Sequence, residues 1–190
     1  MDTTIRHLNI EVTKKCNQRC FYCFNDSGIG SQAAELSFEQ WLNILRALQR
    51  KGLQSIHLTG GEPFAYKNAV KLLAGAQALG LSTSILSNGL RLEDLMRTSP
   101  DVFRRLSVAQ ISLDSMNEDA HNIRRGYARA WQDAITAIRA LRQLDVPVEV
   151  SCVVSDTNLA DVTAVAEFCR SVDAALLLRP IIPNGRAANQ

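Results

Sequence analysis

The chain has 190 residues, which is the length of one domain at roughly 150 residues per domain. Hydrophobic residues make up 46% and charged residues 21%, so the chain has enough apolar side chains for a packed core and is neither disordered nor collagen-like. The formal net charge is +2, and paired basic residues such as Lys14-Lys15 do not continue into a basic stripe. We therefore expect neither nucleic-acid binding nor membrane-surface binding.

The N-terminus lacks the apolar segment of a secretory signal, and no apolar run reaches the roughly 18 residues that a membrane helix needs. We therefore expect a cytoplasmic protein. In a reducing compartment, five cysteines do not predict a disulfide scaffold, and clustered cysteines indicate metal ligands or nucleophiles. Three of the five, Cys16, Cys20 and Cys23, form one cluster.

Six short runs rich in Val, Ile and Leu predict strands at 7–12, 55–59, 82–87, 108–113, 148–154 and 175–180. Several are apolar almost throughout, as is typical of parallel strands covered on both faces. Ser37 and Gln40 form a capping box at the start of a helix that Gly52 ends. The helical period predicts further helices over 70–79, 92–96, 131–141 and 159–168.

The regular alternation of strands and helices predicts an α/β fold with a parallel sheet and right-handed crossovers. The pattern alone fits part of a barrel as well as an open doubly wound sheet. We expect one core domain over residues 1–182. Because no helix follows to cover the sixth strand, we expect 183–190 to be a linker to a missing or truncated C-terminal extension.

Polar motifs follow four of the predicted strands. The cysteine cluster follows the first, Gly60-Gly61-Glu62-Pro63 the second, Ser87-Asn88-Gly89 the third, and Ser112-Leu113-Asp114 the fourth. The carboxyl ends of parallel strands share one edge of the sheet, which is where such folds bind ligands. The sequence therefore predicts a site at this edge.

The spacing of Cys16, Cys20 and Cys23 in one loop allows three thiolates to bind one soft metal centre. A structural zinc site needs a fourth ligand and a second close pair, whereas Cys152 and Cys169 fall in a strand and a helix and resemble small buried hydrophobic residues. Three ligands without a fourth indicate an open coordination position, which usually serves catalysis. Zinc completed by a distant residue, or three cysteines clustered by chance, are the alternatives.

The segment from Cys16 to Cys23, with Tyr22 before the last cysteine, resembles the signature of the radical S-adenosylmethionine (SAM) superfamily, and Gly60-Gly61-Glu62-Pro63 resembles its GGEP motif. The resemblance covers nearly the whole chain and implies a partial (β/α)6 barrel, similar to part of a TIM barrel. It implies a [4Fe–4S] cluster on the three cysteines, with SAM chelating the open iron. Reductive cleavage of SAM would then give methionine and a 5′-deoxyadenosyl radical that abstracts hydrogen from a substrate.

The same resemblance implies a set of SAM contacts. The glycine pair would let the backbone approach the SAM ammonium, and the glutamate would add a negative charge there. The serine and asparagine after the third strand suit ribose hydroxyls, although this sequence is equally typical of a turn. An arginine at 125 would pair with the SAM carboxylate, and a valine at 153 would face adenine unless it only packs in the core. The expected cofactor-binding residues are Tyr22, Gly60, Gly61, Glu62, Pro63, Ser87, Asn88, Ser112, Asp114, Arg125 and Val153.

Residues 121–126 resemble the HDxxRG segment of the peptide-modifying branch, with Asn122 in place of the usual Asp. Residues 183–187 resemble the linker of SPASM-type and twitch-type enzymes. The resemblance thus implies a maturase with a peptide or small-molecule substrate and an electron donor such as a flavodoxin or ferredoxin. If Arg179 points into the barrel and is buried, it should meet a carboxylate, for example that of the substrate.

Two other functions remain open from the residues alone. A non-catalytic Fe–S electron carrier would need a fourth protein ligand such as Cys152. A zinc-stabilised binding module would need zinc in place of iron and sulfide.

Overall fold

The computed structural model describes residues 5–31 and 33–189, which form one six-stranded parallel sheet in the order β1-β2-β3-β4-β5-β6. The strands are β1 (His7–Glu11), β2 (Ser55–Thr59), β3 (Ser82–Ser87), β4 (Leu106–Ser112), β5 (Val148–Val154) and β6 (Ala175–Pro180). Each strand pairs with the next in sequence, so every connection crosses over the sheet. This is the partial (β/α)6 barrel that the family resemblance implies.

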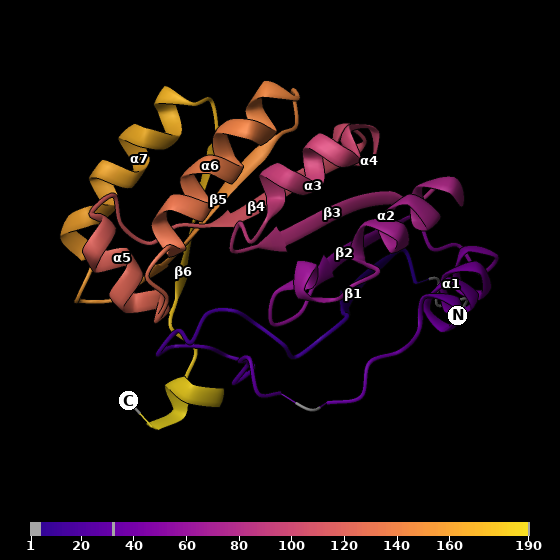
Figure 1. Ribbon diagram of the computed structural model, residues 1–190, viewed down its shortest axis with the longest axis horizontal. Coiled ribbons are helices and arrows are strands. Elements are labelled where there is room, and N and C mark those ends of the chain that lie inside the picture. The colour runs from indigo at the N-terminus through magenta and orange to yellow at the C-terminus, as the bar shows by residue number, and fades with distance from the viewer. Residues whose placement is uncertain (1–4, 32, 190) are drawn as a thin grey trace.

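The helices lie along one side of the strands, as Figure 1 shows, and the segment between β1 and α1 runs along the other side with the C-terminal turn. The α-helices are α1 (Phe38–Gln49), α2 (Ala69–Ala78), α3 (Leu92–Thr98), α4 (Pro100–Arg104), α5 (Glu118–Arg125), α6 (Ala130–Gln143) and α7 (Val162–Ser171). Three short 3-10 helices complete the described elements: η1 (Pro63–Ala65), η2 (Leu159–Asp161) and η3 (Gly185–Asn189). The predicted capping box at Ser37 is present: Gln40 N donates to the Ser37 side chain, and Ser37 N donates to the Gln40 side chain.

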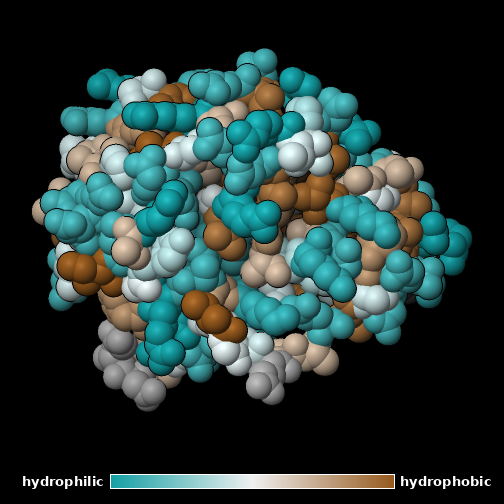
Figure 2. Space-filling view, viewed as in Figure 1, coloured by the Kyte–Doolittle hydropathy of each residue, from teal (hydrophilic) through white to brown (hydrophobic). Residues whose placement is uncertain are grey.

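The main core lies between the sheet and this helix layer. Alternate strand residues such as Ile56, Leu58, Ile85 and Ile111 point into it and are fully buried. Hydrophilic side chains cover most of the face seen in Figure 2, with hydrophobic patches between them. Of the two arrangements that the pattern left open, the structure has the partial barrel: helices cover one face of the sheet, and the other face carries polar side chains and the cavity described below.

Two helices differ from the sequence expectation. The third helix ends at Thr98, before Pro100 as expected, but Pro100 then begins the short helix α4, which was not expected. The first helical position tolerates a residue without an N–H group. Helix α5 was not expected because its buried side chains include His121, Arg124 and Arg125, so it has no apolar stripe. No helix among the described residues is long and apolar enough to cross a bilayer.

The burial of the strands predicts an unequal response to truncation. Leu58 is fully buried beneath the helices, whereas Leu178 on the edge strand β6 is 51% exposed. We expect Leu58→Ala to lower the free energy of unfolding by about 2–5 kcal/mol, and Leu178→Ala by about 1 kcal/mol or less. Equilibrium urea unfolding of both variants measures this difference. Equal losses would contradict the placement of the core beneath the central strands.

Candidate functional site

All six strands contribute to one cavity at the carboxyl edge of the sheet. Its volume is about 560 Å³, which is within the usual range for a small-molecule site. Strand residues that line it include Glu11, Thr59, Leu86, Ser112 and Val153, one from each of β1 to β5, and from β6 Leu177 and Arg179. The cysteine loop closes one side.

The three clustered cysteines all line this cavity and none forms a disulfide. Backbone N–H groups point at two of the sulfur atoms: Gln18 N lies 3.4 Å from Cys16 Sγ, and Ser27 N lies 3.4 Å from Cys23 Sγ. Burial raises the pKa of Cys16 to about 12, so a thiolate there requires a positively charged partner. Thiols that share a cavity and need such a partner fit an iron–sulfur cluster.

The three cysteines of the loop and the two remaining cysteines have different surroundings. Among the described residues, no group of three His, Cys, Asp or Glu side chains is close enough to hold one ion. In a cluster each thiolate binds a different iron, so the sulfur atoms need not surround one point. Cys152 and Cys169 are buried outside the cavity lining, as their interpretation as small hydrophobic residues predicts.

Gly60 and Gly61 allow the turn after β2 to approach the start of the cysteine loop. Gly60 has a φ of +152°, and a Cβ atom there would lie 2.6 Å from the carbonyl oxygen of Thr13. A Cβ atom on Gly61 would collide with the carbonyl oxygen of Lys15. Two backbone bonds join the segments, from Gly61 N to Thr13 O at 2.7 Å and from Glu62 N to Lys15 O at 2.9 Å. The glycine pair thus fixes the entry to the cysteine loop.

Glu62 joins the ends of β2 and β3. Its carboxylate accepts hydrogen bonds from Asn88 N at 2.7 Å, Ser87 Oγ at 2.8 Å and Phe64 N at 3.2 Å. The side chain is fully buried at the cavity wall, and this desolvation raises its pKa to about 7, although the three hydrogen bonds act in the opposite direction. A positively charged ligand group in the cavity would favour the ionised form.

Asp114 is a buried hub that ties the cysteine loop to β5 and α5. Its carboxylate accepts hydrogen bonds from Tyr22 OH, from Arg125 Nη2 at 2.9 Å and from Val153 N at 2.9 Å. Burial alone would raise the pKa of Asp114, but the charge of Arg125, followed by smaller contributions, lowers it. Asp114 is therefore ionised and does not itself line the cavity.

Arg125 lies between Asp114 and the cysteine loop. Burial acts to lower its pKa, but Asp114, Tyr22 and Cys20 together raise it, so the guanidinium keeps its charge. It lines the cavity, and its Nε is buried without a partner among the described residues. The same charge acts against the rise that burial causes in the pKa of Cys20. The site thus holds a fixed cation next to a cysteine sulfur.

Asn122 shows a structural role for the residue that departs from the HDxxRG pattern. Its Oδ1 accepts from Trp131 N at 2.9 Å, and its Nδ2 donates to Ala128 O at 2.8 Å. An aspartate could make only the first of these bonds. The amide therefore braces the link between α5 and α6.

The segment after β6 packs against the cysteine loop. Arg186 donates from its backbone N to Cys23 O at 3.0 Å and from Nε to Cys20 O at 2.9 Å, and its side chain pairs with Asp26 at 2.6 Å. Gly185 adopts a φ of +58°, with a Cβ position that would lie against the backbone of Cys23. The chain end thus helps to shape the cysteine loop.

The structure brings most of the predicted site residues together. The lining of the cavity includes Cys16, Cys20, Tyr22, Cys23, Gly60, Gly61, Glu62, Ser87, Asn88, Ser112, Arg125 and Val153. Pro63 is buried beside it at the start of η1 and does not line it. The condition set for Arg179 is not met, because its side chain is exposed and bonds neutral groups. Arg124 is buried and donates to Val153 O, so it is not a solvated helix residue.

Other site residues were not predicted individually. Arg186 belongs to the segment 183–187 that resembles a linker, but its carbonyl partners, Cys20 O and Cys23 O, lie more than 160 residues away in the sequence. His121 accepts a hydrogen bond from Asp114 N through Nδ1, and burial lowers its pKa to about 3, so it is neutral. Glu11 and Thr59 end their strands at the predicted edge, a position that could have identified them.

Comparisons with known proteins identify the family of the chain. The family model described as "Radical SAM superfamily" matches residues 10–169. The sporulation killing factor maturation protein SkfB of Bacillus subtilis (strain 168) is 31% identical over 165 residues, and the PqqA peptide cyclase of Bradyrhizobium diazoefficiens is 28% identical over 165 residues. Both alignments cover 87% of this chain but only 40% and 43% of the relatives, so the chain spans less than half of their length.

Solved structures share the fold. Streptococcus suis SuiB bound to S-adenosylmethionine matches with a TM-score of 0.80 at 17% identity, over 94% of this chain and 41% of SuiB. The anSMEcpe protein with bound AdoMet matches with a TM-score of 0.76 at 18% identity, over 93% of this chain and 51% of that protein. Because the family model covers most of the described residues, the cysteine cluster and the barrel edge included, the chain belongs to the radical SAM superfamily.

Proposed function

We propose that this chain is the catalytic core of a radical SAM enzyme, with a [4Fe–4S] cluster on Cys16, Cys20 and Cys23 and SAM in the adjoining cavity. The observation that carries the proposal is that three unpaired thiols share one cavity with the GGEP turn and with a charged arginine. When bound, the cluster supplies the electron that cleaves SAM to methionine and a 5′-deoxyadenosyl radical.

The residues of the chain would bind and orient SAM. The ionised Glu62 and the turn at Gly60-Gly61 would lie near its ammonium group. Arg125, whose Nε has no partner among the described residues, would donate to its carboxylate while Asp114 holds the guanidinium through Nη2.

The nucleoside of SAM would meet the ends of the middle strands. Asn88 and Ser87 would contact the ribose, although both also make the turn bonds that were the alternative to this role. Ser112 would offer a further hydroxyl, and Val153 an apolar contact for adenine. The barrel wall and the cysteine loop would exclude water from the reaction.

We further propose a peptide as substrate. Two relatives carry names that refer to peptides or to maturation, and one solved neighbour is SuiB bound to the precursor peptide SuiA. The segment 121–126 supports the same branch. The reaction would also need an external electron donor such as a flavodoxin or ferredoxin, because the electron that cleaves SAM must be delivered to the cluster from outside.

Replacement of single cysteines tests the ligand set. After anaerobic reconstitution, we expect Cys20→Ala to lose the bound iron and the formation of 5′-deoxyadenosine from SAM. Cys152→Ala should keep both, because that side chain lies outside the cavity lining. Iron and sulfide analysis and product chromatography measure the outcome. Full SAM cleavage by Cys20→Ala, or loss of iron in Cys152→Ala, would refute the assignment.

The role proposed for Glu62 has a cost in stability that depends on pH. A carboxyl whose pKa is raised by folding, here from 4.5 to about 7, favours the folded state below pH 4.5 and loses that contribution as the pH rises to 7. Relative to Glu62→Gln, wild-type protein without cofactors should lose about 3 kcal/mol of unfolding free energy between pH 4.5 and pH 8. Urea unfolding at a series of pH values measures this slope. Parallel pH profiles for the two proteins would rule it out.

Asp114 should be essential for the shape of the cysteine loop. Asp114→Asn leaves Arg125 buried without an ion pair, so we expect a loss of about 3–5 kcal/mol in unfolding free energy. Tyr22→Phe removes one hydroxyl and keeps that ion pair, so its loss should be about 1–3 kcal/mol. Both variants are compared by urea unfolding and by iron content after reconstitution. A smaller loss for Asp114→Asn than for Tyr22→Phe would contradict the hub.

A further inference from the structure

Arg179 differs from the other two arginines that line the cavity. The charged side chains of the lining are Glu11, Glu62, Arg125, Arg179 and Arg186. Arg125 pairs with Asp114, and Arg186 pairs with Asp26. Arg179 is an arginine of the described cavity lining that makes no ion pair with a described carboxylate.

The Arg179 side chain is nevertheless held in place. Its Nε donates to Ser151 Oγ at 3.1 Å, and one terminal nitrogen donates to Gln110 Oε1 at 3.2 Å. The Gln110 amide is itself oriented by a bond from Nε2 to Glu149 Oε2 at 2.8 Å. A guanidinium has five N–H donors, and these contacts use two of them. Three adjacent strands thus fix the group and leave donors free.

The Arg179 side chain stands on the cavity side of the sheet. Arg179 is the register partner of Val153 across β5 and β6, and partners in a parallel sheet point to the same face. Both residues line the cavity that also contains the cysteine sulfur atoms. Leu177 and Ile182 belong to the same lining and give the surroundings of Arg179 an apolar part.

We propose that Arg179 is a substrate-anchoring residue that binds a carboxylate of the peptide substrate, on an acidic side chain or at the peptide C-terminus. The inference rests on the proposed function for the peptide but concerns a group other than those assigned to SAM. The rigid guanidinium would bind the carboxylate through two parallel hydrogen bonds. Gln110 and Ser151 act as positioning residues for it.

Peptide retention by the protein tests this directly. The probes are three pools of acetylated pentapeptides, randomised among neutral residues around a fixed centre. One pool has Glu at the centre and an amidated C-terminus, one has Gln there and an amidated C-terminus, and one has Gln there and a free C-terminal carboxylate. Equilibrium dialysis followed by mass spectrometry gives the retained fraction, for reconstituted protein with SAM and for protein without cofactors.

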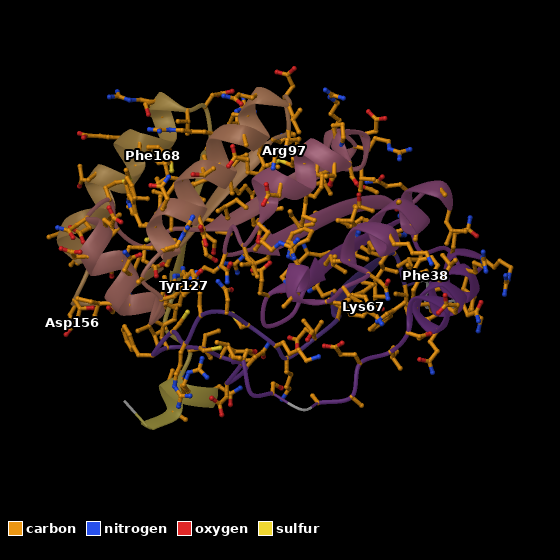
Figure 3. The ribbon with its side chains drawn as sticks, viewed as in Figure 1. Phe38, Lys67, Arg97, Tyr127, Asp156 and Phe168 are labelled. Carbon is orange, nitrogen blue, oxygen red and sulfur yellow. The ribbon has the colours of Figure 1, made fainter. Side chains whose placement is uncertain are left out.

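We expect wild-type protein to retain one or both carboxylate-bearing pools at least about tenfold better than the amide pool, since a hydrogen bond to a charged group contributes about 1.5–3 kcal/mol. Arg179→Gln should abolish the preference, and Arg179→Lys should keep part of it as a point charge. The matched control is Arg97→Gln, which removes an arginine from the outer helix layer on α3 (Figure 3), where the side chain is 75% exposed.

The arms separate the possible failures. Equal retention of all pools by wild-type protein, or an unchanged preference in Arg179→Gln, would overturn the proposal. So would a loss of SAM affinity in Arg179→Gln with unchanged peptide retention, since the arginine would then serve the carboxylate of SAM. Wild-type protein that binds no iron would count against the proposed function, while the preference of cofactor-free protein would still decide the role of Arg179.

Discussion

The buried carboxylate of Asp114 is the interaction on which the site depends. It accepts from Tyr22 in the cysteine loop, from Arg125 at the end of α5 and from the backbone of β5, so three segments far apart in sequence meet at one charge. A buried carboxylate is tolerable only with such partners. The cysteine loop has no helix or strand between residues 12 and 31, and its position is therefore set mainly by contacts of this kind.

Close backbone approach provides the second constraint on that loop. Gly60 and Gly61 let the β2 turn contact the beginning of the loop, and Gly185 contacts the loop near Cys23. Gly126 lets the end of α5 approach the middle of the loop, where a Cβ atom on this residue would lie 2.7 Å from Arg19 O. At each point a side chain would collide with backbone rather than with a movable side chain. The loop is thus enclosed from three directions before any cofactor binds, which lowers the ordering cost of binding one.

The sequence was sufficient for the parts of the protein that follow local rules. Apolar runs located all six strands. The cysteines and the other polar motifs that follow the strands predicted the candidate site, because parallel strands end at a common edge. Helix α5 escaped this reasoning because its buried face is polar, and the partnership of Tyr22 with Asp114 could not be found from a separation of 92 residues. The family resemblance supplied Arg125, but only the structure shows that Asp114 occupies one side of it.

The two faces of the sheet explain why the cavity has the character of a polar binding site. Residues that alternate along β4 and β5 send Ile111 and Val150 toward the helices, whereas Gln110, Glu149 and Ser151 belong to the opposite face. Parallel sheets enclosed on both faces are typically apolar, whereas this face carries a hydrogen-bonded row of polar side chains at the cavity. The hydrogen-bonded row that ends at Arg179 is therefore better explained by a charged substrate than by packing alone.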